Sequence, residues 1–248
     1  MKFARSHRFI NGKECSKCHT AKVRTRELRK KYNLTRDGVE EIRQRQHGRC
    51  LGCMRELPRN YCIDHDHATG LVRGLLCRSC NLTLGMVRED KAVLTRLRLY
   101  LDRDPSKQSI YLIGSLRNRG VSSLAAELRK HGFIVWDEWL AAGPDADDYW
   151  RDYEKEKGHD MAQALKGLAA QNVFYFDKSL IDLADIGVLV MPCGKSAHLE
   201  LGYMAAQGKP TYVLLDKPPE RFDVMAEFAS GVTTDIDKLV VWVKRSEA

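Results

Sequence analysis

The chain has 248 residues, a formal net charge of +8 and a hydrophobic share of 44%. That length suits two domains of ordinary size, and without a run of about 18 apolar residues we expect no membrane span. The basic N-terminus, MKFARSHRFINGK, lacks the apolar stretch of a secretory signal, so we expect no signal peptide.

Positive charge and cysteines are both concentrated in the first half of the chain. Residues 1–108 carry 25 Lys and Arg against 12 Asp and Glu, whereas the remaining 140 carry 16 against 21. A basic domain favours a polyanionic partner, nucleic acid first, although a charged, solvated surface is the simpler alternative. Seven of the eight cysteines precede residue 81, and paired CxxC spacing favours metal ligation over disulfides. We therefore expect a reducing, cytoplasmic setting.

Two CxxC pairs separated by 23 residues predict a zinc site. Their thiolates are those of Cys50, Cys53, Cys77 and Cys80. Four thiolates at this spacing suit tetrahedral zinc, and a small domain gains about 10 kcal/mol or more of folding free energy from such an ion. An earlier pair, Cys15 and Cys18, has no second CxxC to complete it, so a second zinc site is left open.

Between the two pairs lies CIDHDHATG, which contains Asp64, His65 and His67, and Asn81 directly follows the last cysteine. Two strands and a helix from Cys77 would form a ββα unit with Asn81 opposite Asp64 and His65. A hard cation such as Mg²⁺ takes oxygen ligands, here the Asp64 carboxylate and the Asn81 carbonyl. Such a cation binds a scissile phosphate, and His65 could accept a proton from an attacking water near neutral pH.

The stretch GRCLGCMRELPRNYCIDHDHATGLVRGLLCRSCNLTLG resembles the recombination endonuclease VII family, a bacteriophage branch of the His-Me (HNH) nucleases. The resemblance covers about residues 30–104 and implies a zinc-stabilised ββα-metal fold that cleaves DNA. It assigns zinc to the four cysteines, the catalytic Mg²⁺ or Mn²⁺ to Asp64 and Asn81, and the general base to His65. His67 would be an accessory residue near the phosphate, and Arg73 is either a phosphate contact or a surface arginine.

The second half of the chain predicts an α/β domain. We divide the chain into a zinc-binding nuclease domain at 1–104, a linker at 105–109 and a second domain at 110–248. Short apolar runs such as SIYLIGS and IGVLVMP alternate with helical segments, which predicts a flavodoxin- or Rossmann-like parallel sheet covered by helices. An insertion at 137–177 is either a lid over a ligand site at the carboxyl ends of the strands or a peripheral helical pair.

The segments SIYLIGS and SAHLELGYMAAQGKPTYVLLD resemble the nucleoside 2-deoxyribosyltransferase-like family over about residues 109–243. The resemblance makes Glu200 the nucleophile that attacks a nucleoside, Asp177 the residue that handles the leaving base, and Tyr111 a neighbour of the nucleophile. The second acid that the family carries before the nucleophile is missing, and Lys195 favours an anionic ligand instead. The alternative is that Glu200 is a helix-start carboxylate held by the helix dipole.

The sequence thus predicts a metal-dependent DNA endonuclease with a C-terminal domain that binds or processes a nucleoside or nucleotide. The alternative function is a deoxyribosyltransferase or N-glycosidase that the basic zinc domain tethers to DNA, and a third is a DNA-binding sensor without catalysis. A homo-oligomer is left open. A phage origin, which the resemblance implies, would place the protein in the cytoplasm of a bacterial host.

Overall fold

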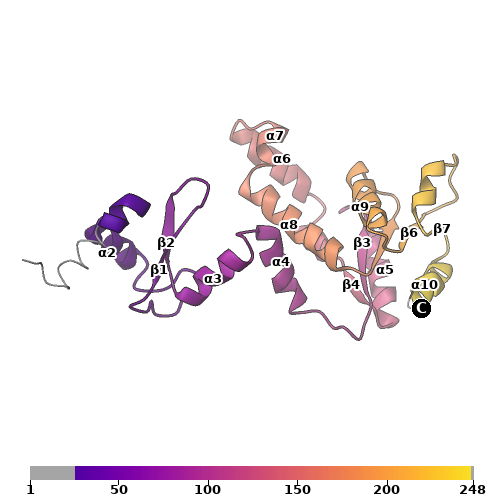
Figure 1. The fold of residues 1–248 in the computed structure, drawn as a ribbon. Helices are drawn as coiled ribbons and strands as arrows, with labels where there is room; N and C mark the ends of the chain where they lie inside the picture. Colours follow the sequence, from indigo (N-terminus) through magenta and orange to yellow (C-terminus); the bar gives the residue numbers. More distant parts are fainter. Residues whose placement is uncertain (1–25, 247–248) are drawn as a thin grey trace, which may run out of the picture. The chain divides into compact units, whose positions relative to one another are not determined.

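The computed structural model describes residues 26–246, which form two compact units that divide between Asp90 and Lys91 (Figure 1). Cys15 and Cys18 lie outside the described residues. Across residues 26–246, no helix combines the length and apolar character needed to cross a membrane. Each unit has its own hydrophobic core.

The first unit is built on a hairpin followed by a helix. After a helical segment at 26–32 come α2 (Arg36–Arg45), β1 (Cys62–His65), β2 (Val72–Leu76) and α3 (Arg78–Met86). α2 begins at Thr35, whose hydroxyl accepts a hydrogen bond from the Gly38 amide and so satisfies one free N–H of the first turn. The antiparallel hairpin and the helix after it confirm the predicted ββα unit. Its core is small and contains Val39, Cys50, Leu57, Leu75 and Leu76.

A β-bulge interrupts the hairpin beside the DHDH motif. Asp64 pairs with Gly74, whereas the next residue, His65, pairs with Val72. Arg73 is therefore the extra residue on β2, and a bulge of this kind redirects a side chain. Gly74 is required by close approach, because a Cβ there would lie 2.9 Å from the Gln46 Oε1 and the Leu51 Cδ1.

The second unit contains a five-stranded parallel sheet with the strand order β4-β3-β5-β6-β7. The strands are β3 (Ser109–Ile113), β4 (Ile134–Trp136), β5 (Ile186–Val190), β6 (Thr211–Leu214) and β7 (Gly231–Thr233). β3, β5 and β6 are buried along their whole length, as expected for a parallel sheet covered on both faces. The predicted α/β domain is confirmed.

Helices cover both faces of this sheet (Figure 1). α5 (Arg119–Lys130) and α10 (Ile236–Arg245) pack on one face through Leu124, Leu128 and Leu239. α8 (Leu168–Leu183) and α9 (Lys195–Ala206) pack on the other through Leu180, Ile181 and Met204. The apolar residues of β3 alternate between the two cores, with Ile110 and Leu112 on one side and Tyr111 and Ile113 on the other.

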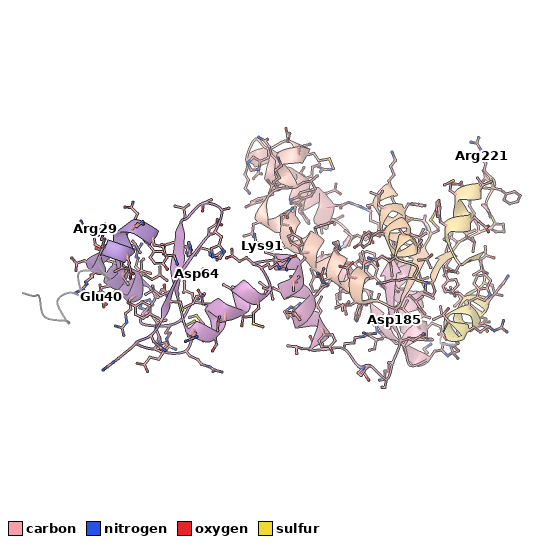
Figure 2. The ribbon with its side chains drawn as sticks, in the orientation of Figure 1. Arg29, Glu40, Asp64, Lys91, Asp185 and Arg221 are labelled. Atoms are coloured by element: carbon pink, nitrogen blue, oxygen red, sulfur yellow. The ribbon has the colours of Figure 1, made fainter. Side chains whose placement is uncertain are left out.

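Helix α4 (Lys91–Tyr100) belongs to the second unit by packing. It lies against α8, where Arg96 pairs with Asp182 at 3.0 Å and the Arg98 guanidinium lies 5.8 Å from the ring centre of Phe176. The two compact units divide at Asp90 and Lys91, and the linker expected at 105–109 stays a prediction. After α4, Arg103 donates a hydrogen bond to Asp185, which also accepts hydrogen bonds from the Ser109 amide and hydroxyl at the start of β3. Asp185 is labelled in Figure 2.

The insertion at 137–177 is mostly helical. It contains η1 (Glu138–Ala142), α6 (Ala146–Glu156), α7 (Met161–Ala164) and the first turns of α8. Arg117, which follows β3, holds Asp147 and Asp148 at the start of α6 at 2.8 and 2.7 Å. A last short helix, η2 (Val224–Phe228), precedes β7.

Candidate functional site

The four cysteines of the two CxxC pairs meet at one point of the first unit. Their sulfurs all lie within 4.8 Å of one another, and the Sγ atoms of Cys53 and Cys77 are 3.9 Å apart. Zinc with thiolates at about 2.3 Å in a tetrahedron requires sulfurs about 3.8 Å apart, so the cluster fits this ion. Gly52 makes the first knuckle tight, because a Cβ there would lie 2.9 Å from the Cys80 sulfur.

The cysteines differ in how readily they ionise. Burial acts to raise the pKa of the Cys50 thiol, but backbone N–H groups, including that of Cys77 at 3.2 Å from the sulfur, outweigh it and lower this pKa to about 6. Burial, with the neighbouring thiols, raises the pKa of Cys80 to about 12. Binding of a metal by all four thiolates therefore releases protons. Of Cys50 and Cys80, Cys80 loses its thiol proton less readily.

A second site lies along the ββα frame of the same unit. A cavity of about 830 Å³ is lined by Asp64, His65, His67 and Asn81, among other residues. Asp64 and His65 come from β1, His67 from the turn that follows it, and Asn81 from α3. The hairpin that carries Asp64 is visible in Figure 2. The structure thus brings together the two predicted ligands of the catalytic metal, Asp64 and Asn81, and the two predicted histidines, His65 and His67.

Asp64 is buried and firmly held by one partner. Arg73 donates from Nε to the Asp64 Oδ2 at 2.7 Å and from Nη2 to the Oδ1 at 3.0 Å, a bidentate pair. Hydrogen bonds to Asp64 and Glu89 raise the pKa of Arg73 further above its already high value. Arg73, which the sequence left between a phosphate contact and a surface residue, is therefore a partner of the candidate metal ligand in this structure.

His65 is oriented by aromatic contacts. Its ring meets Tyr32 edge-on with the centres 5.3 Å apart, and it meets His67 edge-on at 4.9 Å. These contacts place an imidazole at the wall of the cavity next to Asp64. Tyr32 was not predicted, because it precedes the motif by thirty residues or so and only the fold brings it to the cavity.

The second aspartate of DHDH has a different task. The Asp66 Oδ1 accepts hydrogen bonds from the amides of Ala68 and Thr69, both at 2.8 Å, and these bonds lower the pKa of the carboxyl. Asp66 therefore shapes the turn between β1 and β2. Of the two aspartates in the motif, only Asp64 lines the cavity.

Glu89 is a site residue that the sequence analysis missed. Its Oε2 accepts a hydrogen bond from the Arg73 Nη1 at 2.9 Å, and its Oε1 lies 3.2 Å from the His67 Nδ1. Arg88 and Glu89 both have left-handed backbone conformations, with φ of 54° and 58°. This turn after α3 brings the carboxylate back to the cavity wall. No sequence pattern predicts this left-handed turn, because neither Arg88 nor Glu89 is a glycine.

The donor set of the cavity fits a hard divalent cation. Asp64 offers carboxylate oxygens and Asn81 an amide oxygen, both of which Mg²⁺ and Mn²⁺ accept. In the structure the Asp64 oxygens are bonded to Arg73, so a cation there shares or replaces that partner.

The three predicted residues of the second unit influence one another electrostatically. Burial and the neighbouring charge of Asp177 raise the pKa of Glu200 to about 7, and burial raises that of Asp177 to about 6. Burial, followed by the charges of Glu200, Asp177 and Glu138, raises the pKa of the Tyr111 phenol. The Tyr111 phenol is thus within electrostatic range of Glu200 and Asp177, and also of Glu138, which the sequence did not single out.

These residues lie where the sheet topology favours a ligand. β3 sits between β4 and β5, so the strand order reverses at β3. In such sheets, ligands bind at this reversal, beyond the carboxyl ends of the strands. Glu138 follows β4, and Glu200 lies on α9 after β5. Asn118, after β3, donates to the Pro192 carbonyl after β5 at 3.1 Å.

Two solved structures are similar to part of this chain. One is a 2-deoxyribosyltransferase from Bacillus psychrosaccharolyticus, with 18% identity, a TM-score of 0.37 and coverage of 53% of this chain and 90% of that one. The other is a CMP N-glycosidase from Clostridium botulinum, with 12% identity, a TM-score of 0.34 and coverage of 55% and 99%.

The first unit has relatives in sequence. The Gene 59 protein of Mycobacterium phage L5 is 42% identical over 82 residues, and that of phage D29 is 40% identical over the same length. Each match covers 32% of this chain, and the chain spans about half the length of these curated relatives. A family model matches residues 25–103, which includes α4, and thereby confirms the resemblance of this segment: residues 25–103 are similar to recombination endonuclease VII.

Proposed function

We propose that the protein is a metal-dependent DNA endonuclease whose cutting site is the cavity beside β1. The observation that carries the proposal is the convergence of Asp64, His65, His67 and Asn81 on one cavity of a ββα frame. The match of residues 25–103 to recombination endonuclease VII supports the reaction class. The excess of Lys and Arg in residues 1–108 supports DNA as the partner.

The residues divide the work of phosphodiester hydrolysis. Asp64 and Asn81 would hold Mg²⁺ or Mn²⁺, which when bound supplies positive charge beside the scissile phosphate. His65, fixed by Tyr32 and His67, would accept a proton from the attacking water. The four cysteines, with zinc, would hold β2 and α3 in place, since Cys77 lies at the start of α3 and Cys80 directly precedes Asn81.

The experiment compares cleavage of plasmid and branched DNA by the full chain and by His65→Ala, with Mg²⁺ or Mn²⁺. Loss of a general base lowers the rate by about 10²–10⁴-fold, while DNA binding should persist. His131→Ala is the matched control, because it removes an imidazole from the second unit. Equal cutting by His65→Ala, or no cutting by the parent with either metal, would reject the proposal.

A second candidate function concerns the second unit. Two partly buried carboxylates, Glu200 and Asp177, have pKa values raised by desolvation to about 7 and about 6, and their charges act on the buried Tyr111. A pair of this kind can provide a nucleophile and an acid for transfer of a glycosyl group from a nucleoside or nucleotide. We infer that the unit binds such a ligand, as a processing enzyme or as a domain that regulates the nuclease.

Release of free base from deoxynucleosides and deoxynucleotides tests this candidate. Glu200→Gln keeps the size of the side chain but removes the nucleophile, so base release should stop. Glu220→Gln, an exposed glutamate of the same unit, is the control. If no nucleoside or nucleotide loses its base with the parent protein, catalysis by Glu200 is rejected.

A further inference from the structure

Asp64, one of the two ligands that the proposed cutting site would offer to a cation, already has a cationic partner. Arg73 binds both Asp64 oxygens, at 2.7 and 3.0 Å. The Asp64 side chain is 12% exposed and that of Arg73 38%, so the carboxylate is enclosed while the guanidinium reaches solvent. The guanidinium can therefore move toward solvent more readily than the carboxylate.

The β-bulge places Arg73 beside Asp64. As the extra residue of the β-bulge it has no paired residue on β1, and its neighbours Val72 and Gly74 carry the register on either side. The remaining guanidinium nitrogen, Nη1, is held by Glu89 at 2.9 Å. The guanidinium therefore bridges two carboxylates, one inside the proposed site and one beside it.

Glu89 is placed there at an energetic cost. Two successive non-glycine residues in left-handed conformation, Arg88 and Glu89, are unfavourable, and strain of this kind is concentrated at functional sites. The result is a carboxylate that binds Arg73 through one oxygen and lies 3.2 Å from His67 through the other. When the Arg73 guanidinium leaves Asp64, Glu89 is therefore a second carboxylate that can bind it.

On the basis of the function proposed above, we propose that Arg73 is an exchangeable counter-ion of the metal site. It neutralises Asp64 until a divalent cation takes that carboxylate, and Glu89 then retains the displaced guanidinium beside the cavity, facing the phosphate. The guanidinium and the cation compete for the same oxygens. Arg73 thus lowers metal affinity while it remains available to a DNA phosphate.

If Arg73 competes with the cation, loss of Arg73 should tighten metal binding. Arg73→Gln removes the competitor, so the Kd for Mn²⁺ should fall roughly tenfold, the change that follows from losing one charge-assisted interaction. Glu89→Gln removes the second partner and leaves the guanidinium on Asp64, so the Kd should rise about threefold. In the Arg73→Gln background Glu89→Gln should have no effect on the Kd, because Glu89 acts through Arg73.

The experiment measures Mn²⁺ binding to the full, zinc-supplied chain by electron paramagnetic resonance of the free ion, without DNA. Asp64→Asn identifies the fraction of binding that belongs to the cavity. Arg59→Gln is the matched control, since Arg59 lines the same cavity and its loss removes the same charge. Arg73→Lys keeps the charge but not the bidentate geometry and should give an intermediate Kd. Thermal unfolding of each variant confirms that it is folded.

The outcomes separate this inference from the function on which it rests. Tighter Mn²⁺ binding in Arg73→Gln than in Arg59→Gln supports the exchange. Equal or weaker binding in Arg73→Gln would overturn it, because Arg73 would then only raise local charge or orient Asp64. If Asp64→Asn binds Mn²⁺ as the parent does, the cavity holds no metal through Asp64, and the proposed cutting site fails with it.

Discussion

The side chain of Gln46 hydrogen-bonds both backbone groups of Leu75. Its Nε2 donates to the Leu75 carbonyl at 2.9 Å, and its Oε1 accepts from the Leu75 amide at 2.7 Å. Gln46 is buried, and its Nε2 also donates to the Arg49 carbonyl at 2.8 Å. This one side chain therefore ties the segment after α2 to the middle of β2, the strand that carries Arg73.

Replacement of Gln46 should weaken the first unit. Gln46→Ala leaves the Leu75 amide and carbonyl without these partners in the interior, which should cost about 2–4 kcal/mol of folding free energy. All four tryptophans lie in the second unit, so amide hydrogen exchange of the hairpin is the suitable measurement. Gln44→Ala, at an exposed position of α2, is the control. Equal exchange in the two variants would contradict the prediction.

Removal of one zinc ligand should unfold the first unit alone. Cys80→Ser is expected to lower the zinc content of the chain and to abolish hydrogen-exchange protection of β1 and β2, because the core of this unit is small. Tryptophan fluorescence should not change, because the second unit has its own core. Cys62→Ser is the control, since Cys62 lies outside the four-cysteine cluster. Full zinc content in Cys80→Ser would contradict a four-thiolate site.

DNA affinity should depend steeply on salt, because Lys and Arg of the first half displace counterions from phosphates. Arg59 lines the cavity, and Arg59→Ala should reduce the slope of log K against log salt by about 1 for every DNA sequence tested. Arg221→Ala, at an exposed position of the second unit (Figure 2), should leave the slope unchanged. Fluorescence anisotropy across a salt series measures both, and equal slopes would remove Arg59 from the DNA surface.

The sequence reveals those parts of the candidate site that depend on short spacings. Two CxxC pairs, the DHDH motif and Asn81 lie within one continuous stretch, so their meeting follows from a hairpin and a helix. The parallel sheet follows equally from its apolar runs, because strands buried on both faces do not alternate.

Other features depend on geometry that residue patterns do not encode. The bulge that turns Arg73 toward Asp64 is a shift of one residue in register, and the left-handed turn at Arg88 and Glu89 uses residues that rarely adopt it. Apolar residues of α4 recur at helical spacing, but amphipathicity does not identify the packing partner of the helix, which is α8.

The raised pKa of Glu200 predicts a pH-dependent stability of the second unit. The pKa of this carboxyl is about 7 in the folded state, against an ordinary value of 4.5. Between these two pH values the folded state therefore keeps a proton that the unfolded state has lost. The contribution of Glu200 is therefore fully present below pH 4.5 and is lost as the pH rises to about 7. Glu200→Gln cannot ionise and should escape this loss.

The free energies of unfolding of the parent protein and of Glu200→Gln should therefore differ more as the pH rises. At pH 4 their free energies of unfolding should agree, whereas at pH 8 Glu200→Gln should be more stable by about 2–3 kcal/mol. Urea unfolding followed by tryptophan fluorescence reports on this unit, where all four tryptophans lie. The exposed Glu220→Gln should show no such difference at either pH. A gain for Glu200→Gln that is the same at pH 4 and pH 8 would mean that packing, and not the buried charge, separates the two proteins.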